Sequence, residues 1–209
     1  MEEGRIVALE PTTDKGCQTR DRIVLAAAEL VAEQGALITS LDDVGTRASA
    51  SRSQLYHYFD DKADLLRAVI RTTNDAVLNG QADLFADLGT WDGLRRWADM
   101  LVASQVARQG SGGCPIGSLV PQLAEHDPGA RAALAEGFDR WEAALRAGLE
   151  DMRSRGLLSA TSDPGWLATA MLASVQGGLV LTQARRDPDQ LRRALDGALA
   201  LLDAYRAPD

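Results

Sequence analysis

The stretch SLDDVGTRASASRSQLYHYFDDKADLLR, which begins at Ser40, restricts the possible fold more than any other part of the chain. Ser40 and Asp43 have the spacing of a capping box, in which each side chain bonds a free backbone N–H at a helix start. A helix over 41–48 follows, small residues at 49–51 interrupt its pattern, and Ser51 can cap a second helix through its hydroxyl. Two short helices joined by a tight turn predict a helix-turn-helix, which places its second helix in the major groove of DNA.

The second helix of this motif, which we call the reader helix, begins at Arg52. Its residues Leu55, Tyr58 and Phe59 are expected to face a core, while the polar residues between them face outward. Arg and Gln side chains can pair with base edges, and Ser, Tyr and His suit phosphate oxygens. The acidic pair at 60–61 ends this short helix and predicts the start of a longer one.

At these residues the chain resembles the TetR family of bacterial one-component transcriptional repressors. The resemblance rests on three motifs, TRDRIVLAAAELVAEQG, ASASRSQLYHYF and DDKADLL, and it covers about residues 15–70. Further along, GCPIGSLVPQLAEHDPGARAALAEGFDRW and SVQGG resemble the ligand-binding half of the LmrA/YxaF-like branch of that family. The resemblance implies a repressor that binds a pseudo-palindromic operator as a homodimer and is released by a small apolar or aromatic effector.

The side-chain chemistry and the resemblance together predict a DNA-binding surface for double-stranded operator DNA. Arg52 and Gln54 are expected to read bases, whereas Tyr56, His57 and Lys62 are expected to contact phosphates. The full set of expected DNA-binding residues is Lys15, Arg20, Ser40, Arg47, Ser51, Arg52, Ser53, Gln54, Tyr56, His57, Tyr58 and Lys62.

The net charge of −8 is unusual for a DNA-binding protein, but it is unevenly distributed. Residues 14–71 hold eight Lys and Arg against nine Asp and Glu, so the excess acid lies mainly outside the helix-turn-helix. Neutralisation of phosphates supplies most of the sequence-independent affinity for DNA. A nearly neutral domain therefore predicts a few placed cations rather than strong non-specific binding.

Helical patterning continues along the rest of the chain, and no strand-like alternation of any length occurs. Before the motif, residues 19–34 place apolar side chains at helical spacing, and Gly35 ends that helix. Asp-Pro pairs at 127–128, 163–164 and 187–188 each put a carboxylate at a helix N-cap and a proline at the first helical position. The remaining helices are expected at 61–84, 91–109, 128–155, 164–185 and 188–205.

These patterns predict an all-α fold with two domains. A disordered tail is expected over 1–14, and a three-helix helix-turn-helix DNA-binding domain over 15–60. A helical ligand-binding and dimerisation domain is expected over 61–209, in which residues 61–84 form the bridge between the two functions.

The last two expected helices carry apolar stripes. On periodicity alone such stripes indicate ordinary core. The family resemblance implies instead that these helices pack against their symmetry mates in a four-helix bundle. The residues expected in the dimer interface are Val175, Leu179, Leu191, Leu195, Leu199 and Leu202.

The resembled fold also implies a small-molecule pocket between the later helices. Such pockets are mainly apolar, with a few polar groups that fix the orientation of the ligand. Gln105 and Gln176 are the more informative members, because a glutamine on an apolar face needs a partner. The residues expected to bind the effector are Trp97, Leu101, Gln105, Cys114, Ile116, Leu119, Phe138, Trp141, Met171 and Gln176.

Cys114, in the stretch GSGGCPIG, supports two readings. Beside a helix N-terminus its thiol pKa would be lowered, and it would then sense oxidants or electrophiles. The alternative is a small buried apolar residue, which is the usual role of a free cysteine.

An enzyme is not expected, and neither is a metal or a cofactor. His57 and His126 are isolated in the sequence, no CxxC or HExxH motif occurs, and GSGG lacks the lysine of a phosphate-binding loop. A purely structural helical adaptor is a third alternative, which a DNA shift assay would separate from a repressor.

The chain is expected to be a soluble cytoplasmic protein without a membrane partner. It contains no run of eighteen apolar residues, and no signal peptide opens it. Its two cysteines, Cys17 and Cys114, are too few and too far apart to predict a disulfide framework.

Overall fold

The computed structural model describes residues 13–208, and over this range the expected all-α fold is confirmed. These residues form helices with short connections and contain no β-strand, apart from an isolated antiparallel bridge between Leu158 and Arg206. Residues 1–12, most of the tail expected at 1–14, lie outside the described residues. Asp14 instead begins the first helix, and Thr13 is its N-cap, because the Thr13 hydroxyl accepts a bond from the Gly16 N–H at 3.2 Å.

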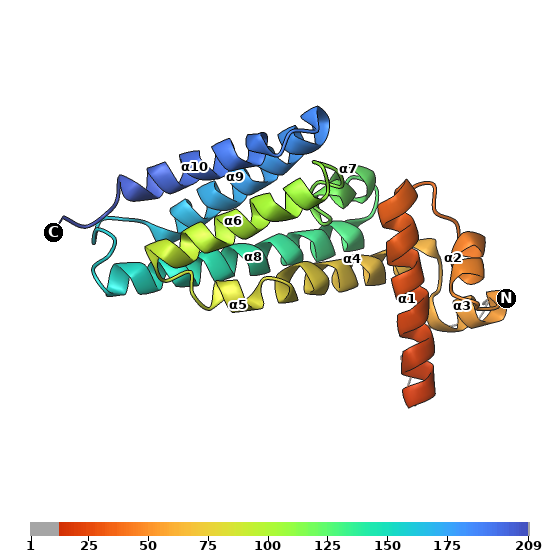
Figure 1. Ribbon diagram of the computed structural model, residues 1–209. Helices are drawn as coiled ribbons and strands as arrows, with labels where there is room; N and C mark the ends of the chain where they lie inside the picture. The colour runs from red at the N-terminus through yellow and green to blue at the C-terminus, as the bar shows by residue number, and fades with distance from the viewer. Residues whose placement is uncertain (1–12, 209) are drawn as a thin grey trace. The chain divides into compact units, whose positions relative to one another are not determined.

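The helices form two compact units, which are not consecutive stretches of the chain (Figure 1). Unit 1 contains residues 13–76 and 118–135, and unit 2 contains residues 77–117 and 136–208. A boundary at residue 60, as expected from the sequence, does not separate these units. The reason is that two long helices, α4 (Lys62–Asn79) and α8 (Pro128–Ser154), each contribute to both.

Unit 1 is built on the first three helices, which follow the predicted order. They are α1 (Asp14–Gln34), α2 (Leu41–Arg47) and α3 (Arg52–Tyr58). The first part of α4, the short helix α7 (Val120–Leu123) and the first turns of α8 complete the unit. The predicted apolar stripe of α1 is confirmed as core, since Ile23, Ala27 and Val31 are all buried.

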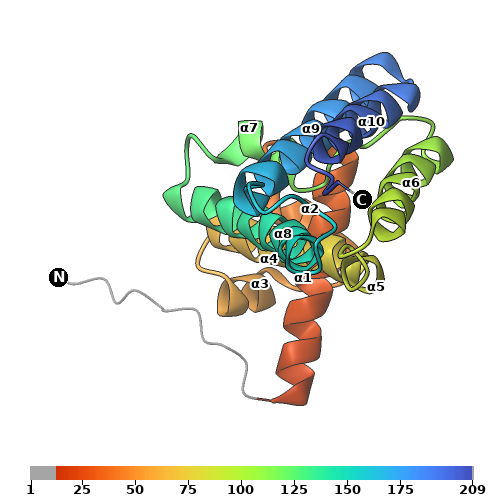
Figure 2. The same cartoon turned by 90° about the vertical axis from the view of Figure 1, so that its left-hand side faces the viewer.

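Unit 2 contains the end of α4, α5 (Ala82–Phe85), α6 (Trp91–Ala107), most of α8, α9 (Pro164–Arg185) and α10 (Asp189–Asp203). Helices α9 and α10 lie side by side along much of their length (Figures 1 and 2), and α6 packs against α10. The core of the unit contains large apolar side chains of α6, α8 and α9, among them Leu94, Trp141, Leu145, Leu149 and Leu167.

The expected helix over 61–84 is interrupted, which corrects that prediction. Helix α4 ends at Asn79, Gly80 follows, and α5 begins only at Ala82. Glycine has a low helix propensity, and the side chain of the next residue is used in a tertiary contact. The Gln81 amide oxygen accepts a bond from the Trp97 indole N–H at 2.9 Å, and both side chains are buried.

Helix α9 is apolar on nearly every side. It begins where Asp163 and Pro164 predicted, and the Asp163 carboxylate accepts bonds from the Gly165 and Trp166 N–H groups at 3.0 and 3.2 Å. By length and composition alone this helix could cross a membrane, but 44% of its apolar window is buried inside unit 2. It is therefore a core helix of this unit that also leaves apolar residues exposed.

Candidate nucleic-acid interface

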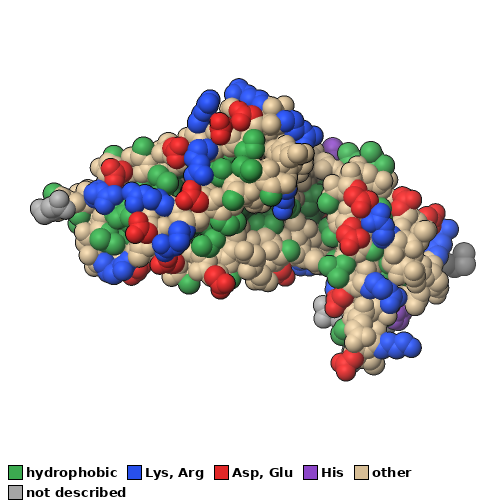
Figure 3. Space-filling model, in the orientation of Figure 1, with side chains coloured by type: hydrophobic (Ala, Val, Ile, Leu, Met, Phe, Trp, Pro, Cys, Tyr) green, Lys and Arg blue, Asp and Glu red, His purple; other side chains and the backbone are tan. Residues whose placement is uncertain are grey.

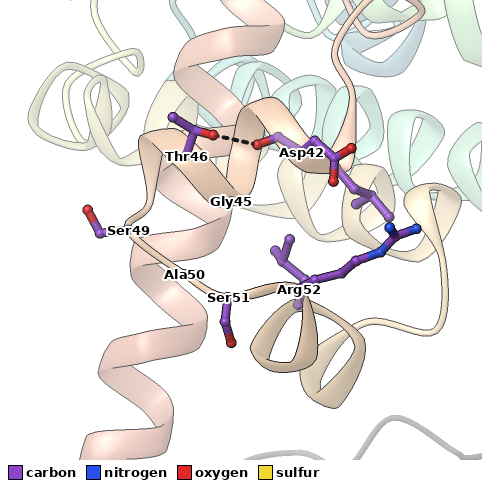
Figure 4. A pocket seen from close by; sticks show the side chains of 9 residues that line it. Asp42, Gly45, Thr46, Ser49, Ala50, Ser51 and Arg52 are labelled. Carbon is purple, nitrogen blue, oxygen red and sulfur yellow. Dashed lines mark hydrogen bonds between the residues drawn. The ribbon is translucent and has the colours of Figure 1, made fainter.

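The helix-turn-helix is assembled by a tight turn between α2 and α3 (Figure 4). Ser49 adopts a left-handed conformation with φ of 49°, and the Ala50 N–H donates to the Gly45 carbonyl at 2.9 Å. A Cβ on Gly45 would lie 3.0 Å from the Ala50 oxygen and 3.2 Å from Leu55 Cδ1. Glycine at this position thus allows the close approach of α2 to the turn and to α3.

A groove of about 370 Å³ lies between α2 and α3, and Figure 4 shows its lining. The Thr46 hydroxyl is bonded to the Asp42 carbonyl at 2.9 Å, and Arg52 extends from the start of α3 across the groove. Asp42 and Thr46 were not among the residues predicted from the sequence. Their four-residue spacing on a short helix places both on the face toward the reader helix, a signal that would have identified them.

Both short helices begin with the capping chemistry that the sequence indicated. Ser40 and Asp43 form the predicted capping box, in which the Asp43 N–H donates to Ser40 Oγ and the Ser40 N–H donates to Asp43 Oδ2, each at 3.1 Å. The Ser40 hydroxyl holds the pKa of the Asp43 carboxyl below its ordinary value. Ser40 is thus committed to the cap in the free protein.

Ser51 caps α3 in the same way. Its partner in this capping box is Gln54, which was expected to read a base. The Gln54 N–H donates to Ser51 Oγ at 3.2 Å, and the Ser51 N–H donates to Gln54 Oε1 at 2.9 Å. A bidentate contact of glutamine to adenine needs both the amide oxygen and the amide nitrogen. The expectation that Gln54 reads a base is therefore not supported, because its oxygen already holds the cap.

The outward side of α3 carries polar side chains that are exposed to solvent and do not take part in a cap. Arg52, Ser53, Tyr56 and His57 are exposed, and Leu55 is buried as predicted. The Arg52 guanidinium lies 5.8 Å from the centre of the Tyr56 ring. His57 packs edge-on against Tyr58, with ring centres 4.8 Å apart and Tyr58 half-buried.

Three of the predicted DNA-binding cations are engaged inside unit 1. Arg47 is paired with Glu33 at 2.9 Å and with Glu29 at 3.3 Å on α1, and the Arg47 contact holds the pKa of the Glu33 carboxyl below its ordinary value. Lys62 Nζ donates to the Leu37 carbonyl at 2.9 Å. Arg20 lies over the Phe59 ring, 5.5 Å from its centre. These three side chains hold helices together in the free protein.

The other two cations of the predicted set, Lys15 and Arg52, are exposed, and Arg52 contacts the ring of Tyr56 on its own helix. Lys15 is exposed in the first turn of α1. On the face shown in Figure 3, acidic and basic side chains alternate over the helices of unit 1 without a continuous basic patch. This arrangement agrees with the nearly neutral charge of residues 14–71.

The residues expected to bind an effector are mostly buried. Trp97, Ile116, Trp141 and Met171 are at most 2% exposed, Leu101, Gln105, Cys114 and Leu119 are also buried, and Phe138 and Gln176 are half-buried. Leu119 belongs to unit 1, and the other nine belong to unit 2. The indole N–H of Trp97 already donates to Gln81.

Unit 2 nevertheless leaves several buried polar atoms without a hydrogen-bond partner among the described residues. In the predicted effector set these are Gln105 Oε1, Trp141 Nε1 and Gln176 Nε2. A buried polar atom without a partner costs about 1–3 kcal/mol. An amide oxygen, an amide nitrogen and an indole N–H together offer one acceptor and two donors.

Cys114 is buried, as the second of the two readings of this residue predicts. Burial raises the pKa of the Cys114 thiol, although the backbone N–H of Gly117, 3.3 Å from Sγ, works in the opposite direction. The effect of burial on the pKa therefore outweighs that of the nearby backbone N–H groups. A thiol that stays protonated and covered reacts slowly with oxidants.

Five of the six residues expected in a dimer interface are buried within the chain. Val175, Leu191 and Leu202 are 0% exposed, Leu195 is 1% exposed, and Leu179 is buried as well. Leu199 alone of the six is half-buried. Side chains without accessible surface in one chain cannot contact a second chain, so the five buried residues form an intrachain seam where α9 and α10 pack together.

An exposed helix that carries Arg, Ser, Tyr and His, held by a tight turn against a second helix, defines a helix-turn-helix DNA-binding protein. A sequence model of bacterial regulatory proteins of the tetR family matches residues 23–69, and one of the tetracyclin repressor-like C-terminal domain matches residues 91–198. The second match covers more than half of the chain. The chain belongs to the TetR family of transcriptional regulators.

Similar proteins carry the same description. The chain is 28% identical to an uncharacterised HTH-type transcriptional regulator in the lacX 3′ region of Lactococcus lactis subsp. lactis, over 85% of this chain and 90% of that protein. It is 28% identical to the transcriptional regulator AcuR of Cereibacter sphaeroides, over 81% of this chain and 78% of that protein. The crystal structure of the regulatory protein TetR from Rhodobacter sphaeroides shares the fold, with a TM-score of 0.75, 23% identity, and coverage of 87% of this chain and 97% of that one.

Family membership decides between the function classes left open by the sequence. TetR-family proteins are DNA-binding transcriptional regulators and not enzymes. Among residues 13–208, no group of His, Cys, Asp or Glu side chains is arranged to hold a metal ion. The assignment to the LmrA/YxaF-like branch stays a prediction.

Proposed function

We propose that this regulator is a homodimeric repressor, which binds a pseudo-palindromic operator and is released by a small effector. The observation that carries the proposal is the outward side of α3, where Arg52, Ser53, Tyr56 and His57 are exposed together. Arg52 is the proposed base-reading residue, and Tyr56, His57 and Lys15 are the proposed phosphate contacts. Repression is proposed because a dimer that occupies a promoter blocks it without any further contact.

An exposed apolar stripe on α9 supports the proposal that the protein is a homodimer. Trp166, Ala173, Gly177 and Val180 recur at helical spacing and are all exposed, with 52% exposure for Trp166 and 63% for Val180. A Cβ on Gly177 would meet nothing within 4 Å, so a second helix can approach closely there. Exposed apolar stripes of this kind mark protein interaction surfaces. We therefore assign the dimer interface to this stripe, in place of the leucines of the seam.

The buried polar atoms of unit 2 that lack a hydrogen-bond partner among the described residues support the proposal that a small effector binds there. Gln105, Trp141 and Gln176 offer donors and an acceptor within an apolar unit, and no ionised side chain is buried among its described residues. A neutral ligand fits these groups better than a charged one, because burial of an uncompensated charge is costly. A small apolar or aromatic molecule with one or two polar groups is the proposed class.

The alternative of a thiol sensor at Cys114 is less well supported than an effector. Its thiol is covered, and burial raises the pKa of that thiol above the ordinary value. A ligand that releases DNA needs only to bind the DNA-incompetent state more tightly. We also propose a cytoplasmic location, where operator DNA is found, and no membrane partner.

Selection of DNA from a randomised duplex library by the purified chain tests the proposed function. The expected result is enrichment of an inverted repeat whose half-sites lie about one helical turn apart, as two copies of α3 require. Enrichment of a single unrepeated site, or no enrichment, would contradict the proposal of a dimeric operator.

A further inference from the structure

Gln122 connects α7 to the turn that precedes α2, and both lie in unit 1. The Ala36 N–H donates to Gln122 Oε1 at 2.8 Å, and Ala36 is fully buried. The other end of the same amide is also held, because Gln122 Nε2 donates to the Ser118 carbonyl at 2.8 Å. The side chain therefore joins the start of the segment 118–127 to the chain between α1 and α2.

The turn over residues 35–39 sets the direction in which α2 leaves α1. Gly35 has a φ of 90°, and a Cβ there would lie 3.0 Å from Gln122 Oε1. On the other side, Lys62 of α4 holds the Leu37 carbonyl, and the Thr39 hydroxyl donates to the Gly35 carbonyl at 2.8 Å. The turn is thus fixed between α7 and α4, and the direction of α2 determines where α3 meets DNA.

The far end of the segment is anchored to α4. The Arg67 guanidinium is 2.9 Å from Asp127 Oδ2, and Asp127 Oδ1 accepts bonds from the Gly129 and Ala130 N–H groups at 2.8 and 3.0 Å. The Asn74 amide donates to the Ala133 carbonyl at 2.8 Å in buried surroundings. Residues 118–133 are therefore bound to the helices of unit 1 at several points.

The near end of the segment follows directly from unit 2. Gly117 is the last residue of that unit before Ser118, and its N–H donates to Cys114 Sγ. A Cβ on Gly117 would lie 2.8 Å from Gln176 Oε1, so the space around this residue is tight. Ser118, whose carbonyl accepts the bond from Gln122 Nε2, follows Gly117 directly in the chain.

We propose that Gln122 is a positioning residue for DNA recognition, which ties the helix-turn-helix to the chain that leaves the effector unit at Gly117. The bond to Ala36 keeps the turn before α2 ordered, so that α3 is presented to DNA in one orientation. Without it, the turn must be ordered when DNA binds, and this cost lowers the affinity. The inference rests on the proposed effector-controlled DNA binding.

Two substitutions of Gln122 distinguish the contribution of its bond to the Ala36 N–H from the contribution of its side-chain shape. Gln122→Met keeps the length of the side chain but removes both the acceptor for the Ala36 N–H and the donor to the Ser118 carbonyl, whereas Gln122→Glu keeps an oxygen for the Ala36 N–H and loses only the donor. The duplex selected by the parent protein serves as the probe. The expected result is about five- to tenfold weaker binding for Gln122→Met and a smaller loss for Gln122→Glu, which keeps the bond to Ala36 but not the bond to Ser118. Amide hydrogen exchange is expected to show lost protection at Ala36 in Gln122→Met alone.

A double-mutant cycle tests whether a change at Gly117 reaches the helix-turn-helix through Gln122. This test needs no identified effector. Gly117→Ala displaces residues 114–117 against Gln176, and it is expected to weaken binding of the same duplex by about two- to thirtyfold. In the Gln122→Met background this effect is expected to be largely lost, because the connection is already broken. Gly148→Ala is the control, since its Cβ would lie 2.5 Å from Leu88 Cβ in another part of unit 2. Its effect is expected to be the same in both backgrounds.

The outcomes separate this inference from the proposed function. A parent chain that selects no duplex contradicts the proposed function itself. A parent chain that binds, with Gln122→Met indistinguishable from it in affinity and in exchange at Ala36, overturns the inference alone. Additive effects of Gly117→Ala and Gln122→Met, or no effect of Gly117→Ala, would also overturn it. Thermal unfolding of each variant shows whether a loss of binding reflects loss of the fold.

Discussion

The seam between α9 and α10 is predicted to hold each chain together, while the exposed stripe of α9 holds two chains together. Leu195 is 1% exposed, and Leu195→Ala would leave a cavity in the seam that costs about 2–5 kcal/mol of the free energy of unfolding. Domains of this kind are stabilised by only about 5–15 kcal/mol in total. We therefore expect this variant to lose much of its stability.

Val180→Glu is expected to have the opposite effect. Val180 is 63% exposed, so within one chain the change alters stability by no more than about 0.5 kcal/mol. In the proposed dimer it buries two symmetry-related charges. At about 2 kcal/mol each, these charges raise the dimer Kd by about a thousandfold. The folded chain is then expected to be monomeric.

Sedimentation velocity at low micromolar concentration, with thermal unfolding of the same samples, distinguishes the two effects. Val106→Glu is the matched control, because Val106 lies on α6 and is 58% exposed. It is expected to remain dimeric and stable. A dimeric Val180→Glu together with a stably folded, monomeric Leu195→Ala would refute the reasoning, because the seam would then be the dimer interface.

Three further predictions concern DNA binding, acid stability and effector response. Arg52→Ala is expected to weaken operator binding about 5- to 150-fold and to relax the base preference at one position per half-site. Arg47→Ala is expected to leave the base preference unchanged, because Arg47 is paired with Glu29 and Glu33 of α1. Competition with duplexes substituted at single positions measures the affinity and the base preference of both variants. Burial would raise the pKa of the Asp127 carboxyl, but the Ala130 N–H and Arg67 outweigh it and lower this pKa below the ordinary value of 3.8. Its contribution to stability is therefore complete above about pH 4 and is lost as the pH falls through the lowered pKa, so acid unfolding of Asp127→Asn should show a weaker pH dependence there. Cys114→Ser is expected to retain operator release by an apolar ligand, and release of the parent by peroxide that this variant lacks would favour the thiol mechanism.

The sequence by itself determined where most helices begin and which class of protein they build. The caps at Ser40, Ser51 and Asp163 are local, because each joins a side chain to a backbone N–H two or three residues away. The apolar stripe of α1 was likewise predicted from the spacing of its apolar residues. Local chemistry of this kind needs no knowledge of what packs against the helix.

The partners of individual side chains were decided only by the tertiary structure. Periodicity showed that α9 and α10 carry apolar stripes, but it did not show that Leu191 and Leu195 of α10 are buried within one chain, where α10 packs against α9. Gln54 and Arg47 have the chemistry of DNA contacts, yet nearby groups in the fold already occupy them. The bond from Ala36 to Gln122 joins residues 86 positions apart. A contact across that distance depends on how the helices pack, and no local pattern of residues records it.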